Sequence, residues 1–528
     1  MQLNDYNNKF EWIILCGLLT SSFLLRVFLS YQIADVHHGD PAFYYVLAEN
    51  LVSGKGFIIE YLWHFHVDYS DITHPIDYWA PGISIITAVF FSFFGESWRV
   101  ATLVVNFSGT FIVLMVYCWG KYLFNKKIGF VAAFFSSINP YFLTDSTYLG
   151  PDTTYIFSLL LASFLIIKGI NDDNKKFWAL GGSLVGISYL MRYEAALFMV
   201  TVFLYFIIRR NKFVFKEKGL WLSILFFLFI VSPWLIRTYI IFDDPLFSTQ
   251  RMTLTLFEWE DFYRLSLPPF ESHLSYMGLR MRLIALRHTV EAFVVQLSTL
   301  GFFFFGIGVY LSSSKKEIWF FYIRTILGLV ITSLSFPAST VQGHAFPTSF
   351  IDCLPVFIIL MVVGLFEFAD KFRNIPFPAN RPNLLKIFVL IGFLSLVTAH
   401  TIIIFRGGDF YGRVRSSIST KEAYGTLGEW IQENTPKESI IMTRNPWELN
   451  YYSRRRAIMI PNEDFQTILE IVKKYHVDYL EIDASFYRLR EPLIPLYNME
   501  NIPDGFTLVY KSDTPYRVLL YKISISDL

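Results

Sequence analysis

The sequence predicts a polytopic α-helical membrane protein with a small α/β domain at its C-terminal end. Of its 528 residues, 54% are hydrophobic and only 17% are charged, and the mean hydropathy is +0.42. Soluble domains carry roughly 25% charged residues. Apolar stretches long enough to span a bilayer recur up to residue 405, and from Arg406 onward the composition becomes that of a soluble domain.

The overall charge and the aromatic content narrow the class of protein further. A formal net charge of +1 is not that of a nucleic-acid binder, which carries a basic patch or stripe. The 55 Phe and 31 Tyr residues suit a lipid-facing protein with aromatic residues at its interfaces. Cys16, Cys118 and Cys353 lie in or beside apolar runs, so we interpret them as packing residues.

Eleven apolar stretches have the length of a membrane span, about 17–25 residues. The first, Trp12 to Phe28, is too long for a signal-peptide core and lacks a cleavage site, so we expect it to be retained. The run from Pro81 to Gly95 is only 15 residues long and opens with Pro-Gly, so we expect a juxtamembrane or re-entrant helix there. The eleven expected spans are 11–30, 98–119, 128–144, 152–169, 176–192, 193–209, 219–238, 287–312, 318–337, 350–368 and 385–405.

Lysine and arginine residues predict the orientation of these spans. If 81–95 does not cross, the loops on one side hold 17 basic residues, whereas the short loops on the other side hold only Lys55. Short basic loops stay cytoplasmic. We therefore expect a cytoplasmic N-terminus and an extracytoplasmic C-terminus in a bacterial or archaeal plasma membrane. The loop at 240–286 contains four arginines, but long loops follow this rule poorly.

The C-terminal part alternates strands and helices, which is typical of an α/β domain. We place the domain boundary at residue 406, so that 1–405 form the transmembrane module, with its first outer loop at 31–97, and 406–528 the extracytoplasmic domain. The expected helices are Thr420–Glu433 and Phe465–Tyr475. The expected strands are Ser439–Thr443, Ala457–Pro461, Val477–Ile482, Phe506–Lys511 and Val518–Ile523.

Eight ionisable residues fall at the outer ends of the expected spans or in the outer loops. Any one of them is explained by a hydrated helix cap or an interhelical pair, but random caps would also populate the inner face. Such residues near membrane depth are functional-site candidates, and together they predict a polar cleft open to the outside. The eight are Asp40, Asp77, Asp145, Asp152, Arg192, Glu194, Arg237 and Asp352.

Asp40 lies in the first outer loop and has two possible roles. It stands directly before Pro41, which suits an N-cap followed by proline at the first helical position. A carboxylate fixed at the membrane surface also suits a general base for an acceptor hydroxyl or amine. The residues alone leave both roles open.

The first outer loop also holds five of the ten histidines, between His37 and His74. Imidazole and carboxylate groups could bind Zn²⁺ or Mn²⁺, but their spacing matches no strong metal motif, and an ordinary polar loop explains them equally well. The candidate ligands are His64, His66, Asp68, Asp71 and His74.

Arginines on the outer face suit an anionic partner. Arg237 ends a span, and its guanidinium suits bidentate phosphate recognition. Arg280, Arg282 and Arg287 lie on an apolar-rich segment whose simpler explanation is contact with lipid headgroups. Because the sequence has no Walker-type loop, GxSxG, zinc-protease helix or GxGxxG motif, we expect an activated lipid rather than a nucleotide as energy source.

Several motifs in order over residues 35–355 resemble those of the GT-C glycosyltransferases, in particular the family 39-like group of protein O-mannosyltransferases and lipid A aminoarabinose transferases. Gly39 to Tyr45 resembles the acidic first-loop motif, and His74 to Gly95 the proline-rich juxtamembrane helix. Further similar segments are Asn139-Pro140 with Asp152, Gly182 to Glu194, Pro233 to Tyr239 and Pro245 to Phe247. Departures are Tyr193, Thr238, Asp243-Asp244 and His344, where the family has Pro, Asn, a glycine and a more basic pattern.

This resemblance implies an inverting transfer of a monosaccharide from a polyprenyl-phosphate donor to a lipid, glycan or protein acceptor. It implies Asp40 as base, Arg237 as leading phosphate contact, and Asp152 and Glu194 as groups that orient acceptor or sugar. A divalent metal (Mn²⁺, Mg²⁺ or Zn²⁺) is a possible cofactor. Further residues expected to bind substrate are Arg192, Tyr44, Asp77 and His344.

Two other classes of protein fit the same composition. A lipid or solute transporter could line its path with the outer-face charges, although transporters usually show inverted repeats and charges at mid-membrane. A non-catalytic scaffold could present the C-terminal domain to a partner. The charges here gather at one face and the sequence has no internal repeat, so we favour the transferase.

Overall fold

The structure is a computed structural model, and it describes residues 2–210, 217–267, 269, 271, 279–335, 348–371, 384–407, 409–484, 489–524 and 526. The chain forms two compact units. The helical unit comprises Met1–Tyr31, Thr102–Phe247 and Leu279–Tyr411. The mixed unit comprises Gln32–Ala101, Ser248–Gly278 and Gly412–Leu528.

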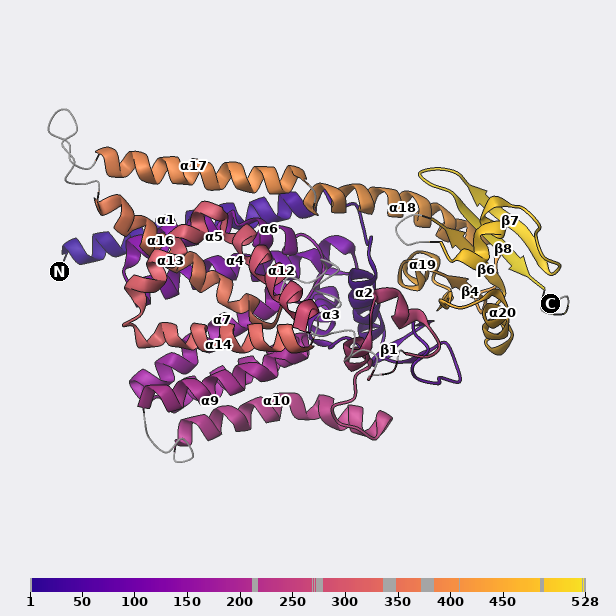
Figure 1. Cartoon of the computed structure of the whole chain (residues 1–528), viewed down its shortest axis with the longest axis horizontal. Coiled ribbons are helices and arrows are strands. Elements are labelled where there is room, and N and C mark those ends of the chain that lie inside the picture. The colour runs from indigo at the N-terminus through magenta and orange to yellow at the C-terminus, as the bar shows by residue number, and fades with distance from the viewer. Residues whose placement is uncertain are drawn as a thin grey trace. The chain divides into compact units, whose positions relative to one another are not determined.

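The helical unit consists of helices that run side by side in Figure 1. Apolar residues are present on nearly every face of most of these helices, as expected for segments that pack in a bilayer. Its elements are α1 (Gln2–Ser30), α4 (Trp98–Leu123), α5 (Lys126–Ser137), α6 (Pro140–Asp145), α7 (Asp152–Asp172), α8 (Lys175–Met191), η1 (Tyr193–Ala195), α9 (Ala196–Arg210), α10 (Lys218–Phe242), α12 (Leu279–Leu297), α13 (Thr299–Ser312), α14 (Lys316–Ser335), η5 (Thr348–Cys353), α16 (Leu354–Lys371) and α17 (Leu384–Gly407).

Among the described residues, five helices are long and apolar enough to cross a membrane, and the bent pair α12 and α13 raises this number to six if it forms one span. The chain is therefore a multi-pass membrane protein. The predicted run 81–95 is α3 (Gly82–Phe94), a short apolar helix of 13 residues. The five spans are Lys9–Ser30, Trp98–Leu123, Asp152–Asp172, Lys218–Phe242 and Ile351–Lys371.

The prediction of one continuous helix at 128–144 is wrong, because the chain breaks between α5 and α6. Asn139 is extended there, and its side chain accepts a hydrogen bond from the Phe142 amide at 3.3 Å. Pro140 follows at the first position of α6. A capping residue followed by proline starts a new helix rather than continuing the old one.

The expected span at 287–312 is not one unbroken helix. α12 and α13 meet at an angle of 96° at Ser298, whose φ is +61°. The last carbonyl groups of α12 are bound from other helices: His400 lies 3.0 Å from the Val295 oxygen, and the Asn139 amide donates to the Gln296 oxygen at 3.0 Å. Side chains thus satisfy backbone groups that the break releases from the helix.

Glycines allow two pairs of helices to approach closely. A Cβ atom on Gly182 of α8 would lie 2.1 Å from the Ser223 oxygen of α10. A Cβ atom on Gly308 of α13 would lie 1.9 Å from the Leu360 oxygen of α16. Small residues at such contacts let helix backbones pack against each other, which is a main source of helix association in lipid.

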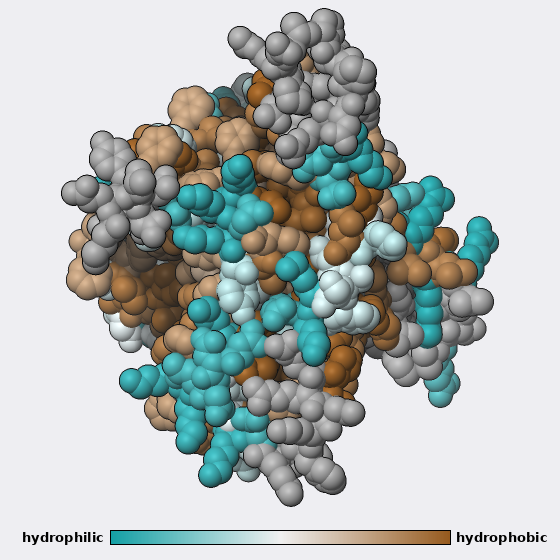
Figure 2. Space-filling view, turned by 90° about the vertical axis from the view of Figure 1, so that its left-hand side faces the viewer, coloured by the Kyte–Doolittle hydropathy of each residue, from teal (hydrophilic) through white to brown (hydrophobic). Residues whose placement is uncertain are grey.

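The basic residues of the short loops lie at helix ends, for example Lys121 in the last turn of α4 and Lys175 at the start of α8. Figure 2 shows the face on the left of Figure 1, where hydrophilic side chains gather among apolar ones. Such a face is typical of helix ends that meet water.

The mixed unit combines the segment after the first helix, the segment 248–278 and the C-terminal segment. Its elements include several that the sequence predicted, namely α18, α20 and the strands β4 to β8. Its elements are α2 (Gly39–Val52), β1 (Ile58–Ile59), β2 (Tyr61–Leu62), β3 (His74–Pro75), α3, η3 (Thr249–Thr255), η4 (Trp259–Tyr263), α18 (Asp409–Asn434), β4 (Ile440–Thr443), α19 (Pro446–Ser453), β5 (Arg456–Met459), α20 (Phe465–Lys474), β6 (Tyr479–Asp483), η7 (Glu491–Leu493), α21 (Ile494–Asn498), β7 (Phe506–Ser512) and β8 (Val518–Ile523).

A six-stranded sheet in the order β2-β5-β4-β6-β8-β7 organises the mixed unit. The first four strands are parallel, and the β8 and β7 strands are antiparallel to their neighbours. The β2 strand comes from the first outer loop: Tyr61 pairs with Ala457 and Leu62 with Ile458. The sequence analysis predicted neither this strand nor α19.

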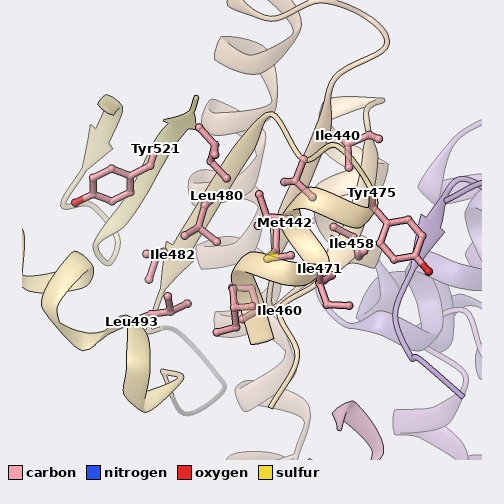
Figure 3. Close-up of a cluster of buried hydrophobic side chains, with 14 of the residues drawn as sticks. Ile440, Met442, Ile458, Ile460, Ile471, Tyr475, Leu480, Ile482, Leu493 and Tyr521 are labelled. Carbon is pink, nitrogen blue, oxygen red and sulfur yellow. The ribbon is translucent and has the colours of Figure 1, made fainter. Parts of the chain in front are cut away.

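Apolar side chains fill the core beside this sheet. In Figure 3, Met442, Ile458 and Leu480 project from neighbouring strands toward Ile471 of α20. Leu62 of the first outer loop belongs to the same core and is fully buried. Burial of these side chains provides the main driving force that holds the two distant parts of the chain together.

Candidate functional site

Three of the predicted site residues meet in the helical unit. Arg192, at the end of α8, places its Nη1 atom 2.6 Å from the Asp152 Oδ1 atom at the start of α7. Its Nη2 atom lies 3.4 Å from the Glu194 Oε1 atom. All three side chains are about 20% exposed. One guanidinium between two accessible carboxylates leaves a net negative charge that can bind hydroxyl groups of a sugar or an acceptor.

A second ion pair joins α14 to η5 and is buried beside Tyr155 of α7. The Arg324 Nη2 atom of α14 lies 3.2 Å from the Asp352 Oδ1 atom and also donates to the Tyr155 hydroxyl at 3.2 Å. The sequence analysis named Asp352 but missed Arg324 and Tyr155. The position of Arg324 inside the apolar run 318–337 could have indicated it, because charged residues near membrane depth are functional-site candidates.

Arg237, the predicted phosphate contact, stacks on aromatic rings of its own helix. Its guanidinium carbon lies 4.6 Å from the Trp234 ring centroid and 5.8 Å from that of Phe242. Asp145 is 8% exposed and lies 3.5 Å from the Tyr148 hydroxyl, which donates to it. His344 lies outside the described residues.

Asp40 does not cap α2, so the capping prediction is wrong. The helix begins at Gly39, and His38 is its N-cap, with a ring nitrogen 3.4 Å from the Asp40 amide. Asp40 and Pro41 are therefore the second and third helical residues. The carboxylate of Asp40 lies in the first helical turn, where the helix dipole favours negative charge, and Asp40 is partly exposed.

Aromatic rings surround the start of α2. Tyr44 is 2% exposed, and its ring packs edge-on against Phe43. Trp63 is 1% exposed and stacks on Trp79 at 4.9 Å. The predicted binding residue Tyr44 is thus part of a buried aromatic cluster, where its ring supports the position of α2.

Asp77 is also buried, and it organises the loop. It accepts hydrogen bonds from the Tyr69 hydroxyl at 2.9 Å and lies 3.1 Å from the His64 Nε2 atom. Burial opposes its charge, but the neighbouring His64 and His74 rings outweigh burial and hold the pKa of Asp77 below its usual range. Its backbone oxygen accepts from the Thr249 amide at 2.8 Å, which ties the segment after Phe247 to the first loop.

The five metal-ligand candidates do not converge. His66 Nε2 lies 2.8 Å from the Phe262 oxygen, both His74 nitrogens face backbone oxygens, and Asp68 binds Lys474 at 2.7 Å. Burial lowers the pKa of His66 to about 4. Within the described part of the chain, no three His, Cys, Asp or Glu side chains are placed to hold a metal ion. These residues therefore do not fit a metal, and we derive no step through one.

Glu448 is a buried carboxyl near Asp40 that the sequence analysis missed. It lies on α19 and is 5% exposed. Burial, together with the negative charges of Asp483 and Asp40, raises the pKa of Glu448 to about 7. Burial, together with the carboxyl groups of Glu448 and Asp40, raises the pKa of the nearby Tyr61 hydroxyl well above its ordinary value. In the sequence, Glu448 follows Pro446 and Trp447 shortly after an expected strand, and only this position could have indicated it.

A family model described as dolichyl-phosphate-mannose-protein mannosyltransferase matches residues 73–236. The fold also matches the crystal structure of ArnT from Cupriavidus metallidurans bound to undecaprenyl phosphate, with a TM-score of 0.61 and 11% identity over 96% of this chain and 97% of that chain. Residues 73–236 thus resemble this mannosyltransferase family, and the chain as a whole has the fold of the ArnT structure.

Other solved structures match with the same fold. The oligosaccharyltransferase of Archaeoglobus fulgidus, in complex with Zn and sulfate, gives a TM-score of 0.59 at 15% identity, over 97% of this chain and 73% of that chain. The mycobacterial arabinofuranosyltransferase AftD gives a TM-score of 0.52 at 12% identity, over 96% of this chain but only 40% of that chain. No curated protein sequence shows a significant match.

Proposed function

We propose that this protein is a GT-C glycosyltransferase that transfers a monosaccharide from a polyprenyl-phosphate donor to an acceptor on the extracytoplasmic side of the membrane. The observation that carries the proposal is Asp40, a partly exposed residue whose carboxylate is held in the first turn of α2. Two similar proteins support the donor class, because one is described with undecaprenyl phosphate and another with a dolichol-phosphate.

The reaction requires a base on one side of the anomeric carbon and positive charge on the other. Asp40 accepts the proton of the acceptor hydroxyl or amine as its oxygen or nitrogen attacks that carbon. The bond between the carbon and the phosphate oxygen breaks with both electrons, so polyprenyl phosphate leaves and the sugar configuration inverts. Arg237 binds the phosphate oxygens, with its guanidinium held by the Trp234 and Phe242 rings.

Asp152, Arg192 and Glu194 bind hydroxyl groups of the sugar or of the acceptor. Arg192 fixes both carboxylates through its two ion pairs, which limits their motion when the substrate enters. Such preorganised groups lower the entropic cost of reaching the transition state. Tyr44 and Asp77 act indirectly, since both are buried and support the loop that carries Asp40.

The orientation in the membrane belongs to the same proposal. Eleven crossings, with α3 at the interface, place the basic helix ends in the cytoplasm and the mixed unit outside. The described residues contain five helices long and apolar enough to cross a membrane, the bent pair α12 and α13 and, besides α3, two shorter apolar helices. The remaining crossings of the proposal rest on the apolar pattern of the sequence. The C-terminal segment would then form an extracytoplasmic α/β domain that meets acceptors directly.

Replacement of Asp40 by Asn tests the base. We expect Asp40→Asn to lower sugar transfer by about 10²-fold or more, because a general base contributes 10²–10⁴-fold. Membranes from cells that carry each variant are incubated with radiolabelled polyprenyl-phosphate sugar, and the label that reaches the acceptor is counted. Asp68→Asn is the matched control, since Asp68 lies in the same loop and its side chain is 87% exposed.

Full transfer by Asp40→Asn would refute the assignment of the base. Mass spectrometry of lipid-linked sugars and surface glycans, with and without the gene, identifies the substrates. We expect one polyprenyl-phosphate sugar to accumulate and one glycan residue to disappear when the gene is absent. Unchanged pools of both would refute the transferase and favour a transporter or a scaffold.

A further inference from the structure

Helix α19 of the C-terminal segment packs directly on the start of α2. A Cβ atom added to Gly39 would lie 3.0 Å from Cδ2 and 3.2 Å from Cε3 of Trp447. Only glycine therefore fits beneath this indole ring without displacing it. Trp447 also lies against Trp63, with ring centroids 5.4 Å apart. Gly39, which precedes Asp40, thus packs against Trp447, which precedes Glu448.

Glu448 has few polar partners in this environment. Among the described residues, its Oε2 atom has no hydrogen-bond partner, and the Tyr61 hydroxyl likewise has none. Ionisation of the buried Glu448 costs free energy unless a cation or hydrogen-bond donors surround the carboxylate. The titratable groups that face it are Asp40 of α2, Tyr61 of β2, Glu481 and Asp483 of β6, and Tyr452 of its own helix.

None of these neighbours is a cation, and three of them are carboxyl groups. A carboxyl in such a place keeps its proton, as in enzymes that hold one acid neutral beside an ionised one. The raised pKa of Glu448, about 7, agrees with this geometry. Neutral Glu448 adds no second charge beside Asp40 and lets α19 stay against α2.

We propose that Glu448 is a positioning residue for Asp40: in its neutral form it keeps α19 packed on α2 and so holds the base in place. This inference rests on the proposed function of Asp40. When Glu448 loses its proton, its charge repels Asp40 and requires hydration, which loosens the contact between Trp447 and Gly39. The C-terminal segment thereby makes the reaction dependent on pH.

The test compares the pH dependence of transfer in the full-length wild type and in Glu448→Gln. Washed membranes supply acceptor and a radiolabelled pool of their own lipid-linked sugars, and initial rates are measured from pH 6 to 9. The wild-type rate should fall above pH 7, by up to about tenfold per pH unit, because the active form loses one proton. Glu448→Gln, which stays neutral, should keep at least half of the wild-type rate at pH 6 and show no such fall.

Glu470→Gln is the matched control, because Glu470 is exposed on α20. We expect it to follow the wild-type profile. The same alkaline fall in Glu448→Gln as in the wild type would overturn the proposal, and so would a uniform loss of activity at every pH in a folded Glu448→Gln protein. Folding of each variant is checked by size-exclusion chromatography.

Tyr61→Phe serves if Glu448→Gln does not fold. Removal of the hydroxyl makes the surroundings of Glu448 less polar, so the alkaline fall should move to higher pH, and an unmoved fall would overturn the proposal. Asp40→Asn distinguishes a failure of the role of Glu448 from a failure of Asp40 as the base. If Asp40→Asn abolishes transfer and Glu448→Gln titrates like the wild type, only the role of Glu448 fails; if Asp40→Asn is fully active, the proposed base fails.

Discussion

The two units each bury a carboxyl group, and they treat it in opposite ways. In the helical unit, Asp352 is 2% exposed and pairs with Arg324, which is fully buried. In the mixed unit, Glu448 is 5% exposed and faces other carboxyl groups. A buried charge needs a partner or gives up its charge. The paired carboxyl therefore serves the architecture, whereas the carboxyl without a cation can respond to pH.

The largest expected effect is on the free energy of unfolding, when Arg324 is replaced and the buried Asp352 loses its cation. Arg324→Leu should destabilise the helical unit by about 3–5 kcal/mol, because it leaves the Asp352 charge buried and uncompensated. The free energy of unfolding is measured by denaturant titration of the protein in detergent. The double variant Arg324→Leu with Asp352→Leu should recover most of this loss. Equal destabilisation by the single and double variants would show that the pair is not the source of the effect.

The second prediction concerns the unpaired carboxyl and stability. Because folding raises the pKa of Glu448 from 4.5 to about 7, the unfolded chain loses this proton first as the pH rises. The free energy of unfolding should thus fall between pH 4.5 and 7, by about 3 kcal/mol, and stay level above pH 7.

Glu448→Gln should remove this decline. The measurement is the difference in the free energy of unfolding between wild type and variant at pH 4.5, 6, 7 and 8. Between pH 4.5 and 7 the wild type should lose about 3 kcal/mol of unfolding free energy relative to the variant, and the difference should stay level above pH 7. A difference that does not change with pH would contradict a protonated Glu448 in the folded chain.

The sequence predicted the elements whose pattern is local. Apolar length predicted the five spans found among the described residues, and short apolar runs between turn residues predicted the strands from Ile440 to Ile523. The prediction failed where residues distant in the sequence determine where a helix begins or ends. α12 ends before Ser298, where side chains of other helices bind the released carbonyl groups, and α2 begins at Gly39, on which Trp447 of the distant helix α19 packs.

The same distinction holds for the candidate site. Asp152, Arg192 and Glu194 were predicted because charged residues are rare at the ends of apolar runs. Glu448 could not be predicted in this way, since a glutamate in a charged, soluble-like segment is ordinary. Its proximity to Asp40 depends on a sheet that joins residues about 400 positions apart.

A third prediction concerns the packing of Trp447 on Gly39, the residues that precede Glu448 and Asp40. Gly39→Ala should destabilise the mixed unit by about 1–2 kcal/mol, since the added methyl group forces the Trp447 ring to move. Gly425→Ala is the control: nothing lies within 4 Å of that position on α18, so this change should stabilise the helix by about 0.5–1 kcal/mol. Both are measured by thermal unfolding, and a neutral Gly39→Ala would show that the ring yields freely.

The smallest effect is expected at an exposed ion pair between the same two regions. Arg454 binds Glu49 through two nitrogens at 2.5 and 3.0 Å, but its side chain is 51% exposed. Arg454→Ala should cost less than about 1 kcal/mol, because water and salt screen such pairs. High salt should abolish even this difference in thermal unfolding. A loss of several kcal/mol would mean that Arg454 matters through its stacking on Tyr451 instead.

The pairing of β2 with β5 also has a consequence for biosynthesis. Tyr61 leaves the ribosome roughly 400 residues before its partner Ala457, which is about 20–80 s at 5–20 residues per second. During this time Leu62 has no core to enter, and the strand edge is open to other chains. The first outer loop must therefore wait for the last quarter of the chain, and a chaperone that covers it in the meantime would raise the yield of folded protein.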